Sequence, residues 1–137
     1  MPLESSHISL TFLDSGQGVL QKVREHLNTA DLLAANREFF DRNLQEFSKC
    51  RYWLSDFTEV ITSTLETTDL QKLSHVSLDA SRHNPDLVVA ICTSGDLIFG
   101  LWEAFPDTTG WTIRVFRSLP EGQAWIREMV DDSLTFR

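Results

Sequence analysis

Eight consecutive residues, DLVVAICT at 86–93, are apolar except at their two ends. A strand with this composition is usually covered on both faces, because a strand with one wet face alternates apolar and polar residues. Covering both faces of a sheet takes helices on either side, which is the arrangement of α/β proteins. The run therefore predicts a central strand of an α/β sheet.

Other segments supply the strands and helices that such a sheet needs. ISLTFL at 8–13 and WTIRVF at 111–116 alternate apolar and polar residues, and the aromatic-rich YWLSDF at 52–57 is short. These patterns are typical of strands. Helical periodicity or helix-start signals mark the segments 30–47, 68–84, 94–105 and 118–130.

The segment VLQKVREHL at 19–27 is compatible with two structures. Leu20, Val23 and Leu27 would suit one face of a helix. The turn DSGQG at 14–18 separates two short runs, however, and its glycines favour a β-hairpin. We expect the hairpin.

The resulting element order is β-β-α-β-α-β-α-β-α. Strands that alternate with helices predict right-handed βαβ crossovers and parallel pairing. Apolar residues make up 42% of the 137 residues, enough for a packed core in one domain. The expected fold is a single α/β domain over 1–137 with a mixed sheet of about five strands and an N-terminal hairpin.

Capping residues mark several helix boundaries. Asn28 or Thr29 can cap the helix that starts near residue 30. Capping boxes, in which a hydroxyl residue is followed three positions later by Glu or Gln, begin at Thr68 and Ser118. No capping or periodic pattern organises DDSLTFR at 131–137, which we expect to fray.

The first predicted helix, 30–47, has an unusually wide apolar face. One stripe contains Leu33, Phe40, Leu44 and Phe47, and a second contains Leu32, Ala35 and Phe39. Such a helix lies either between the sheet and a neighbouring segment, or with its second stripe against another subunit. In the predicted helix 94–105, Phe99 lies outside the helix face that contains Trp102, so it would add to an exposed apolar patch. Leu32, Phe39 and Phe99 are therefore the interface candidates.

Charge and composition narrow the classes of function. The formal net charge is −8, which disfavours binding to nucleic-acid phosphates and to anionic membranes. No apolar run has the roughly 20 residues of a membrane span, and the start of the chain does not resemble a signal peptide. Cys50 and Cys92 have no metal-site spacing. Cys92 lies in an apolar run and is expected to be a buried free thiol, which fits a reducing compartment. We expect a cytoplasmic protein.

Catalytic and metal-binding motifs do not appear in the sequence. There is no H-E-x-x-H, no G-x-S-x-G, no phosphate loop and no Cys/His cluster. The expectation is a protein that is not an enzyme and has no catalytic residues, metal or cofactor.

Three segments carry a resemblance to a known family. They are YWLSDFTEV at 52–60, PDLVVAICTSGDLIFGLWEAF at 85–105 and TIRVFRSLPEGQAWI at 112–126. In strand pattern, Gly-Asp helix start and Trp-containing last helix, these segments resemble STAS-like proteins, named for sulfate transporters and anti-sigma-factor antagonists. The SpoIIAA-like branch is the more similar. The resemblance implies an α/β fold and no general activity.

In the anti-sigma-factor antagonists, a serine at a helix N-terminus after the Asp-bearing strand is phosphorylated. The family pattern is an aspartate, two serines and a glycine, whereas this chain reads VITSTLETTD at 60–69. Ser63 and Thr64 are the nearest hydroxyls and are the phosphorylation candidates that the resemblance implies. The alternative is that hydroxyls 62–68 only cap and turn the chain.

Asp56 ends the strand 52–57, where α/β sheets often place ligand-binding groups. It either contacts a ligand or ties down a loop through backbone N–H groups. Trp53, Trp102 and Phe105 are expected in the core, where they would line any pocket between helices and sheet.

Three functions remain open on the sequence. The leading expectation is a regulatory protein–protein interaction with an unknown partner, with a homodimer possible through the apolar helix face. The alternative is a small-ligand or lipid-binding domain. An enzyme that uses Asp56 and a nearby histidine is the third.

Overall fold

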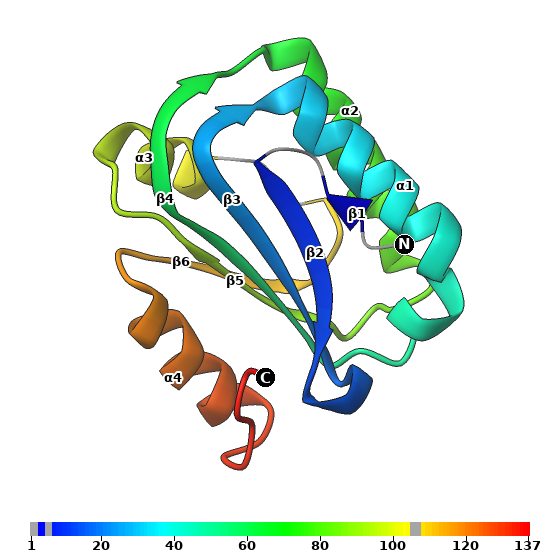
Figure 1. The fold of residues 1–137 in the computed structure, drawn as a ribbon. Helices are drawn as coiled ribbons and strands as arrows, with labels where there is room; N and C mark the ends of the chain where they lie inside the picture. The colour runs from blue at the N-terminus through cyan, green and yellow to red at the C-terminus, as the bar shows by residue number, and fades with distance from the viewer. Residues whose placement is uncertain (1–2, 5–6, 105–107) are drawn as a thin grey trace.

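A computed structural model describes residues 3–4, 7–104 and 108–137. It is an α/β fold with one six-stranded mixed sheet in the order β1-β2-β3-β4-β5-β6 (Figure 1). The elements are β1 (Leu3–Glu4), β2 (Ile8–Leu13), the 3-10 turn η1 (Asp14–Gly16), β3 (Gly18–Asn28), α1 (Thr29–Phe47), β4 (Tyr52–Thr64), α2 (Thr67–Ser81), β5 (Val88–Cys92), α3 (Asp96–Ala104), β6 (Thr112–Phe116) and α4 (Leu119–Met129). The predicted fold class is confirmed, with the two-residue β1 as an addition.

The N-terminal hairpin forms as predicted. β2 and β3 pair antiparallel, with Ile8 opposite Val23 and Leu13 opposite Gly18. Asp14, Ser15 and Gly16 in the turn all have positive φ, at 52°, 56° and 91°. From β3 onward every neighbouring pair is parallel, and α1, α2 and α3 make the three crossovers.

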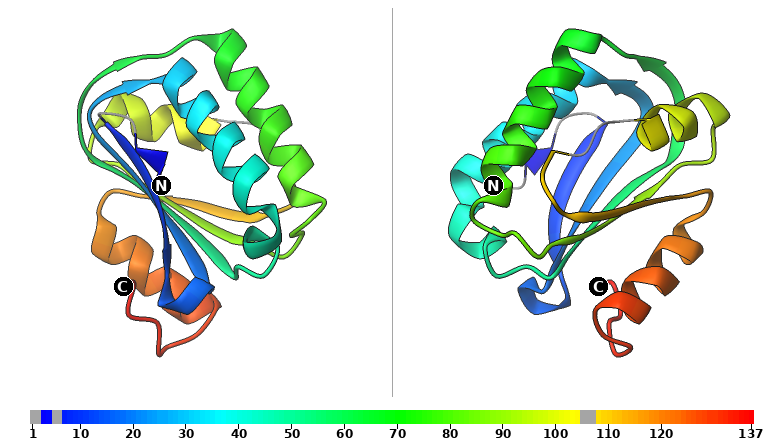
Figure 2. Two further views of the ribbon diagram at one scale, coloured as in Figure 1. Left: turned by 45° about the vertical axis from the view of Figure 1, so that its right-hand side comes forward. Right: turned by 180° about the vertical axis from the view of Figure 1, so that it is seen from behind.

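Helices cover the sheet from both sides. Figures 1 and 2 show α1 and α2 side by side on one face and α4 on the other. Residues 52–57 of β4 are all buried, with Trp53 and Phe57 in the clusters of the α1 side and Leu54 in that of the α4 side. β5 is also buried apart from Ile91, so the prediction of a central covered strand is confirmed.

β4 is longer than the sequence indicates. The prediction ended this strand at residue 57, but it runs to Thr64 beside the equally extended β3, with Asn28 opposite Thr64. The stretch 58–64 is rich in the β-branched residues Thr, Val and Ile, which favour strands, and backbone pairing with β3 extends β4 through it. The loop assignment for this stretch was wrong.

Two of the predicted caps are confirmed and one is wrong. Asn28 Oδ1 accepts hydrogen bonds from the backbone N–H groups of Ala30 and Asp31, at 2.9 and 3.3 Å. Ser118 Oγ accepts from the N–H of Glu121 at 3.3 Å. α2 begins at Thr67 with Glu66 as its N-cap, so Thr68 lies inside the helix and does not cap it.

Helix α1 lies between the sheet and α2, which explains its wide apolar face. Leu32 and Phe39 are only 1% and 2% exposed within the single chain. Both side chains were candidates for a contact with another subunit. The structure corrects this assignment, because the core of the same chain already covers them.

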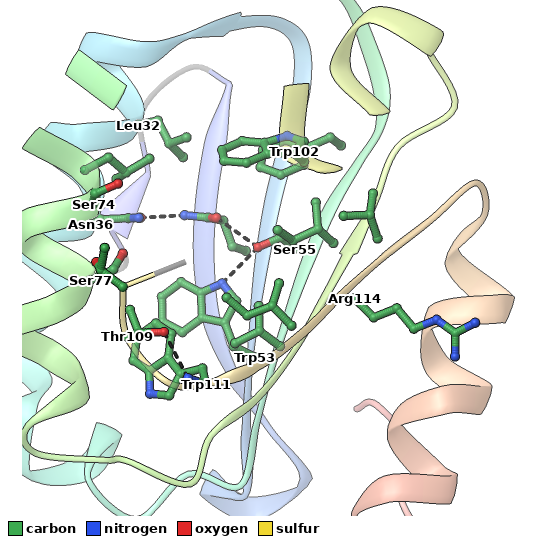
Figure 3. A pocket seen from close by; sticks show the side chains of 18 of the residues that line it. Leu32, Asn36, Trp53, Ser55, Ser74, Ser77, Trp102, Thr109, Trp111 and Arg114 are labelled. Carbon is green, nitrogen blue, oxygen red and sulfur yellow. Dashed lines mark hydrogen bonds between the residues drawn. The ribbon is translucent and has the colours of Figure 1, made fainter. Parts of the chain in front are cut away.

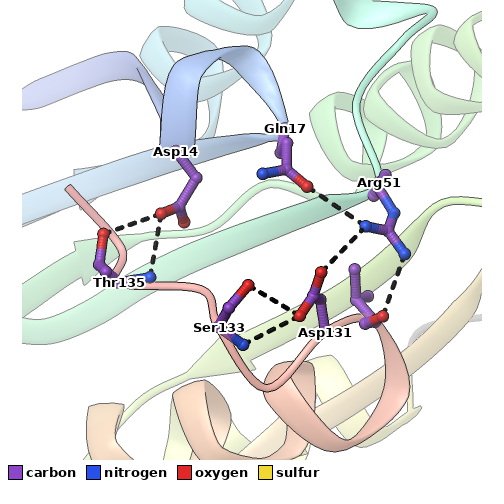
Figure 4. A network of polar contacts seen from close by, with 7 residues as sticks. Asp14, Gln17, Arg51, Asp131, Ser133 and Thr135 are labelled. Carbon is purple, nitrogen blue, oxygen red and sulfur yellow. Dashed lines mark hydrogen bonds and ion pairs between the residues drawn. The ribbon is translucent and has the colours of Figure 1, made fainter.

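The segment 131–137 packs against the rest of the protein and does not fray as expected. Leu134 is 2% exposed and belongs to the cluster under α4. Arg51 Nη2 donates to the carbonyl oxygen of Val130 at 3.0 Å, and its Nη1 lies 3.7 Å from the carboxylate of Asp131 (Figure 4). Long-range polar contacts, which a local pattern does not reveal, hold this segment in place.

Candidate ligand pocket

A pocket of about 320 Å³ opens between the α1–α2 layer and the sheet (Figure 3). Strands β3 to β6 form its floor, α1 and α2 one wall, and α3 with the residues before β6 the other. α2 packs mainly on α1. This volume is within the range typical of small-molecule sites.

Aromatic side chains form much of the pocket wall. Trp53 and Phe57 of β4, Trp102 of α3 and Trp111 in the loop before β6 all line it. The rings of Phe57 and Trp102 are stacked, with centroids 5.4 Å apart and planes at 16°. Trp111 Nε1 donates to the carbonyl oxygen of Asn84 at 2.7 Å, which holds this ring in place. The wall is therefore largely aromatic, and contacts with neighbouring groups hold several of its rings.

A chain of hydrogen bonds crosses the buried floor of the pocket. Trp53 Nε1 donates to Ser55 Oγ at 2.9 Å, and Ser55 Oγ donates to Gln21 Oε1 at 3.1 Å. Gln21 Nε2 then donates to Asn36 Oδ1 at 2.5 Å. None of these four residues is more than 7% exposed. Uncharged polar groups thus stand inside an otherwise apolar cavity, as in many binding sites.

Hydroxyl and charged groups lie around the rim. Ser74 and Ser77 of α2 are partly buried and face the pocket in Figure 3. Glu103 and Arg114 are exposed, and Figure 3 shows the Arg114 side chain extending away from the cavity toward α4. Among the residues that the structure describes, the buried lining therefore contains no side chain that is charged at neutral pH.

Comparison of the chain with protein-family models, with curated proteins and with solved structures found no match. The function of the pocket is therefore argued from its geometry alone.

Two of the three sequence candidates for a pocket lining are in place. Trp53 and Trp102 line it, and Phe105 lies outside the described residues. Sequence reasoning missed Gln21 and Asn36. A signal existed for both, because Gln21 interrupts the inward-facing positions of β3 and Asn36 interrupts the apolar stripes of α1.

Asp56 lies outside the pocket and anchors the backbone. It is 3% exposed, and its Oδ1 accepts from the N–H and the hydroxyl of Thr58, at 2.9 and 2.6 Å. These bonds span the register shift where Lys22 pairs with Asp56 but Arg24 pairs with Glu59. The carboxylate therefore stabilises a bulge in β4. Of the two roles expected for Asp56, the contacts match the one in which it ties down the backbone.

The two phosphorylation candidates lie at the end of β4, not at a helix N-terminus. Ser63 is partly buried and Thr64 is exposed. The hydroxyl of Thr64 lies 3.1 Å from Nε2 of His26, and the Nδ1 of the same ring lies 2.7 Å from the hydroxyl of Thr62. This corrects their expected placement, because α2 begins only at Thr67.

The thiols are buried and weakly acidic. Burial raises the pKa of Cys50 to about 11, and burial together with the charge of Asp56 raises that of Cys92 to about 12.

Within the described ranges, no three His, Cys, Asp or Glu side chains come together in a group that could hold a metal ion. Among the helices described there, none has the length and apolarity needed to cross a bilayer.

Proposed function

We propose that this protein binds a small, largely apolar molecule in the pocket between α1–α2 and the sheet. The observation that carries the proposal is a cavity of about 320 Å³ with aromatic walls and a buried polar chain at its floor. Protein interiors are close-packed, and voids much larger than a water molecule are few. A cavity of this size is therefore best explained as a space for a ligand.

The arrangement of tryptophans provides a direct binding assay. Trp53, Trp102 and Trp111 line the pocket, whereas Trp125 packs against Phe116 on the α4 side. A Trp125→Phe variant would report only on the pocket. We expect 6-propionyl-2-dimethylaminonaphthalene, a neutral fluorescent naphthyl ketone, to quench the tryptophan emission in a saturable way and to shift its own emission to the blue.

Two matched variants on α2 locate the binding site. Ser77 lines the pocket, and Gln71 is exposed on the same helix outside it. Ser77→Phe fills the cavity and should weaken probe binding about tenfold or more, equivalent to about 1.4 kcal/mol. Gln71→Phe adds the same ring outside the pocket and should leave binding unchanged. Equal binding by both variants, with native circular dichroism, would rule out this pocket as the site.

The pocket moves the ligand-binding alternative ahead of the protein–protein interaction expected from the sequence. Two of the three proposed contact residues, Leu32 and Phe39, are buried in the core. Phe99 is partly exposed and lies under the guanidinium of Arg117, 3.9 Å from the ring centroid. A homodimer stays a prediction that light scattering across protein concentrations would test, with a strict monomer contradicting it. Kinship with STAS-like proteins also stays a prediction, supported by the order of elements.

A further inference from the structure

The hydrogen-bond chain at the pocket floor has a definite direction. An indole N–H can only donate, so Ser55 Oγ must accept from Trp53. In the structure, the Ser55 hydroxyl donates to Gln21 Oε1, so the amide oxygen of Gln21 faces Ser55.

Asn36 is the last member of the hydrogen-bond chain. The nitrogen of the Gln21 amide faces Asn36 and donates to its Oδ1, because an amide NH₂ group can only donate. The NH₂ group of Asn36 is left as the end of the chain. Among the described residues, Asn36 Nδ2 is the donor of no side-chain hydrogen bond, and it is not one of the fully buried polar atoms without a partner, so this nitrogen is open to the cavity. Asn36 is 7% exposed and lines the pocket.

A ligand that fills the cavity displaces water from this NH₂ group, and a ligand that supplies an acceptor avoids leaving the donor unpaired. We propose that the pocket selects neutral, largely apolar molecules that carry a hydrogen-bond acceptor, such as a ketone or amide oxygen, which Asn36 Nδ2 binds. This inference rests on the proposed function and specifies the ligand class for the same site.

The ligand is neutral because the described part of the cavity wall has no buried group that would balance a charge. Its buried residues include no cationic side chain, and Arg114 extends away from the cavity. A carboxylate in this space would lose its hydration and gain only neutral donors. Exposed Glu103 at the rim would further disfavour an anion.

Three ligands of similar shape test the proposal. The ketone 2-acetylnaphthalene carries a neutral acceptor, 2-isopropenylnaphthalene has none, and 2-naphthoate carries an anionic one. We expect the ketone to bind about three- to tenfold more tightly than the hydrocarbon, the gain typical of one hydrogen bond. The naphthoate should bind more weakly than the ketone. In the protein-bound ketone, the carbonyl stretch should move to lower frequency, as hydrogen bonding requires.

An Asn36→Asp variant isolates the donor. It keeps an acceptor for Gln21 Nε2 but replaces the NH₂ group with oxygen, so the preference for the ketone over the hydrocarbon should vanish. Gln45→Glu makes the same chemical change at an exposed position of α1 and should keep the preference. If Asn36→Asp does not fold, the ligand ratio and the carbonyl stretch in the wild-type protein decide the matter.

The outcomes separate this inference from the proposed function. Failure of all three ligands to bind overturns both. If the ligands bind but the ketone binds no more tightly than the hydrocarbon, and its carbonyl stretch is unshifted, the role of Asn36 is overturned. Binding in the pocket would still stand. Tightest binding by 2-naphthoate overturns the selection for neutral molecules.

Discussion

The carboxylate of Asp14 binds Thr135, 121 positions later in the chain, through both the backbone N–H and the hydroxyl, each at 2.9 Å (Figure 4). The second oxygen of Asp14 accepts from the hydroxyl of Tyr52 at 2.6 Å and from the N–H of Phe136 at 3.1 Å. One side chain in the β2–β3 turn therefore ties together the hairpin, β4 and the segment 131–137.

Replacing Asp14 with Asn should lower the free energy of unfolding by about 1–3 kcal/mol, because hydrogen bonds to a charged acceptor are lost or weakened. Asn tolerates the positive φ of 52° at this position, so the turn itself is not strained by the change. Urea denaturation measures the effect. Asp132→Asn removes an exposed charge from the same segment and is the control. Equal urea midpoints for the two variants would contradict the role of Asp14.

The contribution of Asp14 should disappear in acid. Burial raises the pKa of Asp14, but hydrogen bonds from Tyr52, Thr135 and Phe136 outweigh it and leave the pKa below its ordinary value of 3.8. The unfolded chain therefore binds the proton more readily. The stability from this group is complete above pH 3.8 and is lost as the pH falls through the lower pKa of the folded state. Urea midpoints of wild type and Asp14→Asn should converge there, and a constant gap at every pH would contradict this.

Both cysteines should be unreactive in the native protein. Thiolate is the reactive form, and burial raises the pKa of Cys50 to about 11 and that of Cys92 to about 12. We expect 5,5′-dithiobis(2-nitrobenzoate) at pH 8 to label neither thiol on the timescale at which it labels both in guanidinium chloride. Rapid labelling of the native protein would show that one thiol is accessible.

Gly18 should not tolerate a side chain. A Cβ there would lie 1.9–2.2 Å from three atoms of the Tyr52 ring, so Gly18→Ala should destabilise the protein by about 1–3 kcal/mol through overpacking. Gly95→Ala is the control, since its Cβ would meet no atom within 4 Å. Thermal unfolding compares the two variants. Tyr52→Leu replaces the ring with a smaller side chain, so Gly18→Ala should cost less stability in the Tyr52→Leu background than in the wild type. An equal cost in both backgrounds would show that the ring of Tyr52 is not the cause.

Ser55→Ala should destabilise the protein by about 1–3 kcal/mol, because it leaves the indole N–H of Trp53 and the carbonyl oxygen of Gln21 without their present partner. Ser9→Ala in β2 removes a strand hydroxyl that does not belong to this hydrogen-bond chain, and it should lower the stability less. Chemical denaturation followed by circular dichroism compares them, and an equal loss would argue against the importance of the buried chain.

Local patterns were sufficient to predict the order of elements and the covered strand β5. The run at 86–93, the glycine-containing turn at 14–18 and the capping box at Ser118 all express preferences of residues close together in sequence. Asn28 caps α1 for the same reason. Such preferences act before any tertiary contact forms, so a sequence pattern shows them.

The length of β4, the pocket and the tie at Asp14 depend on residues far apart in the chain. Pairing with the equally long β3 decides that β4 continues to Thr64. Gln21 and Asn36 looked like isolated polar residues, and only the packing of α1 over β3 brings them into one hydrogen-bond chain. A buried polar group is stable only with a partner, and the fold as a whole decides which partner that is.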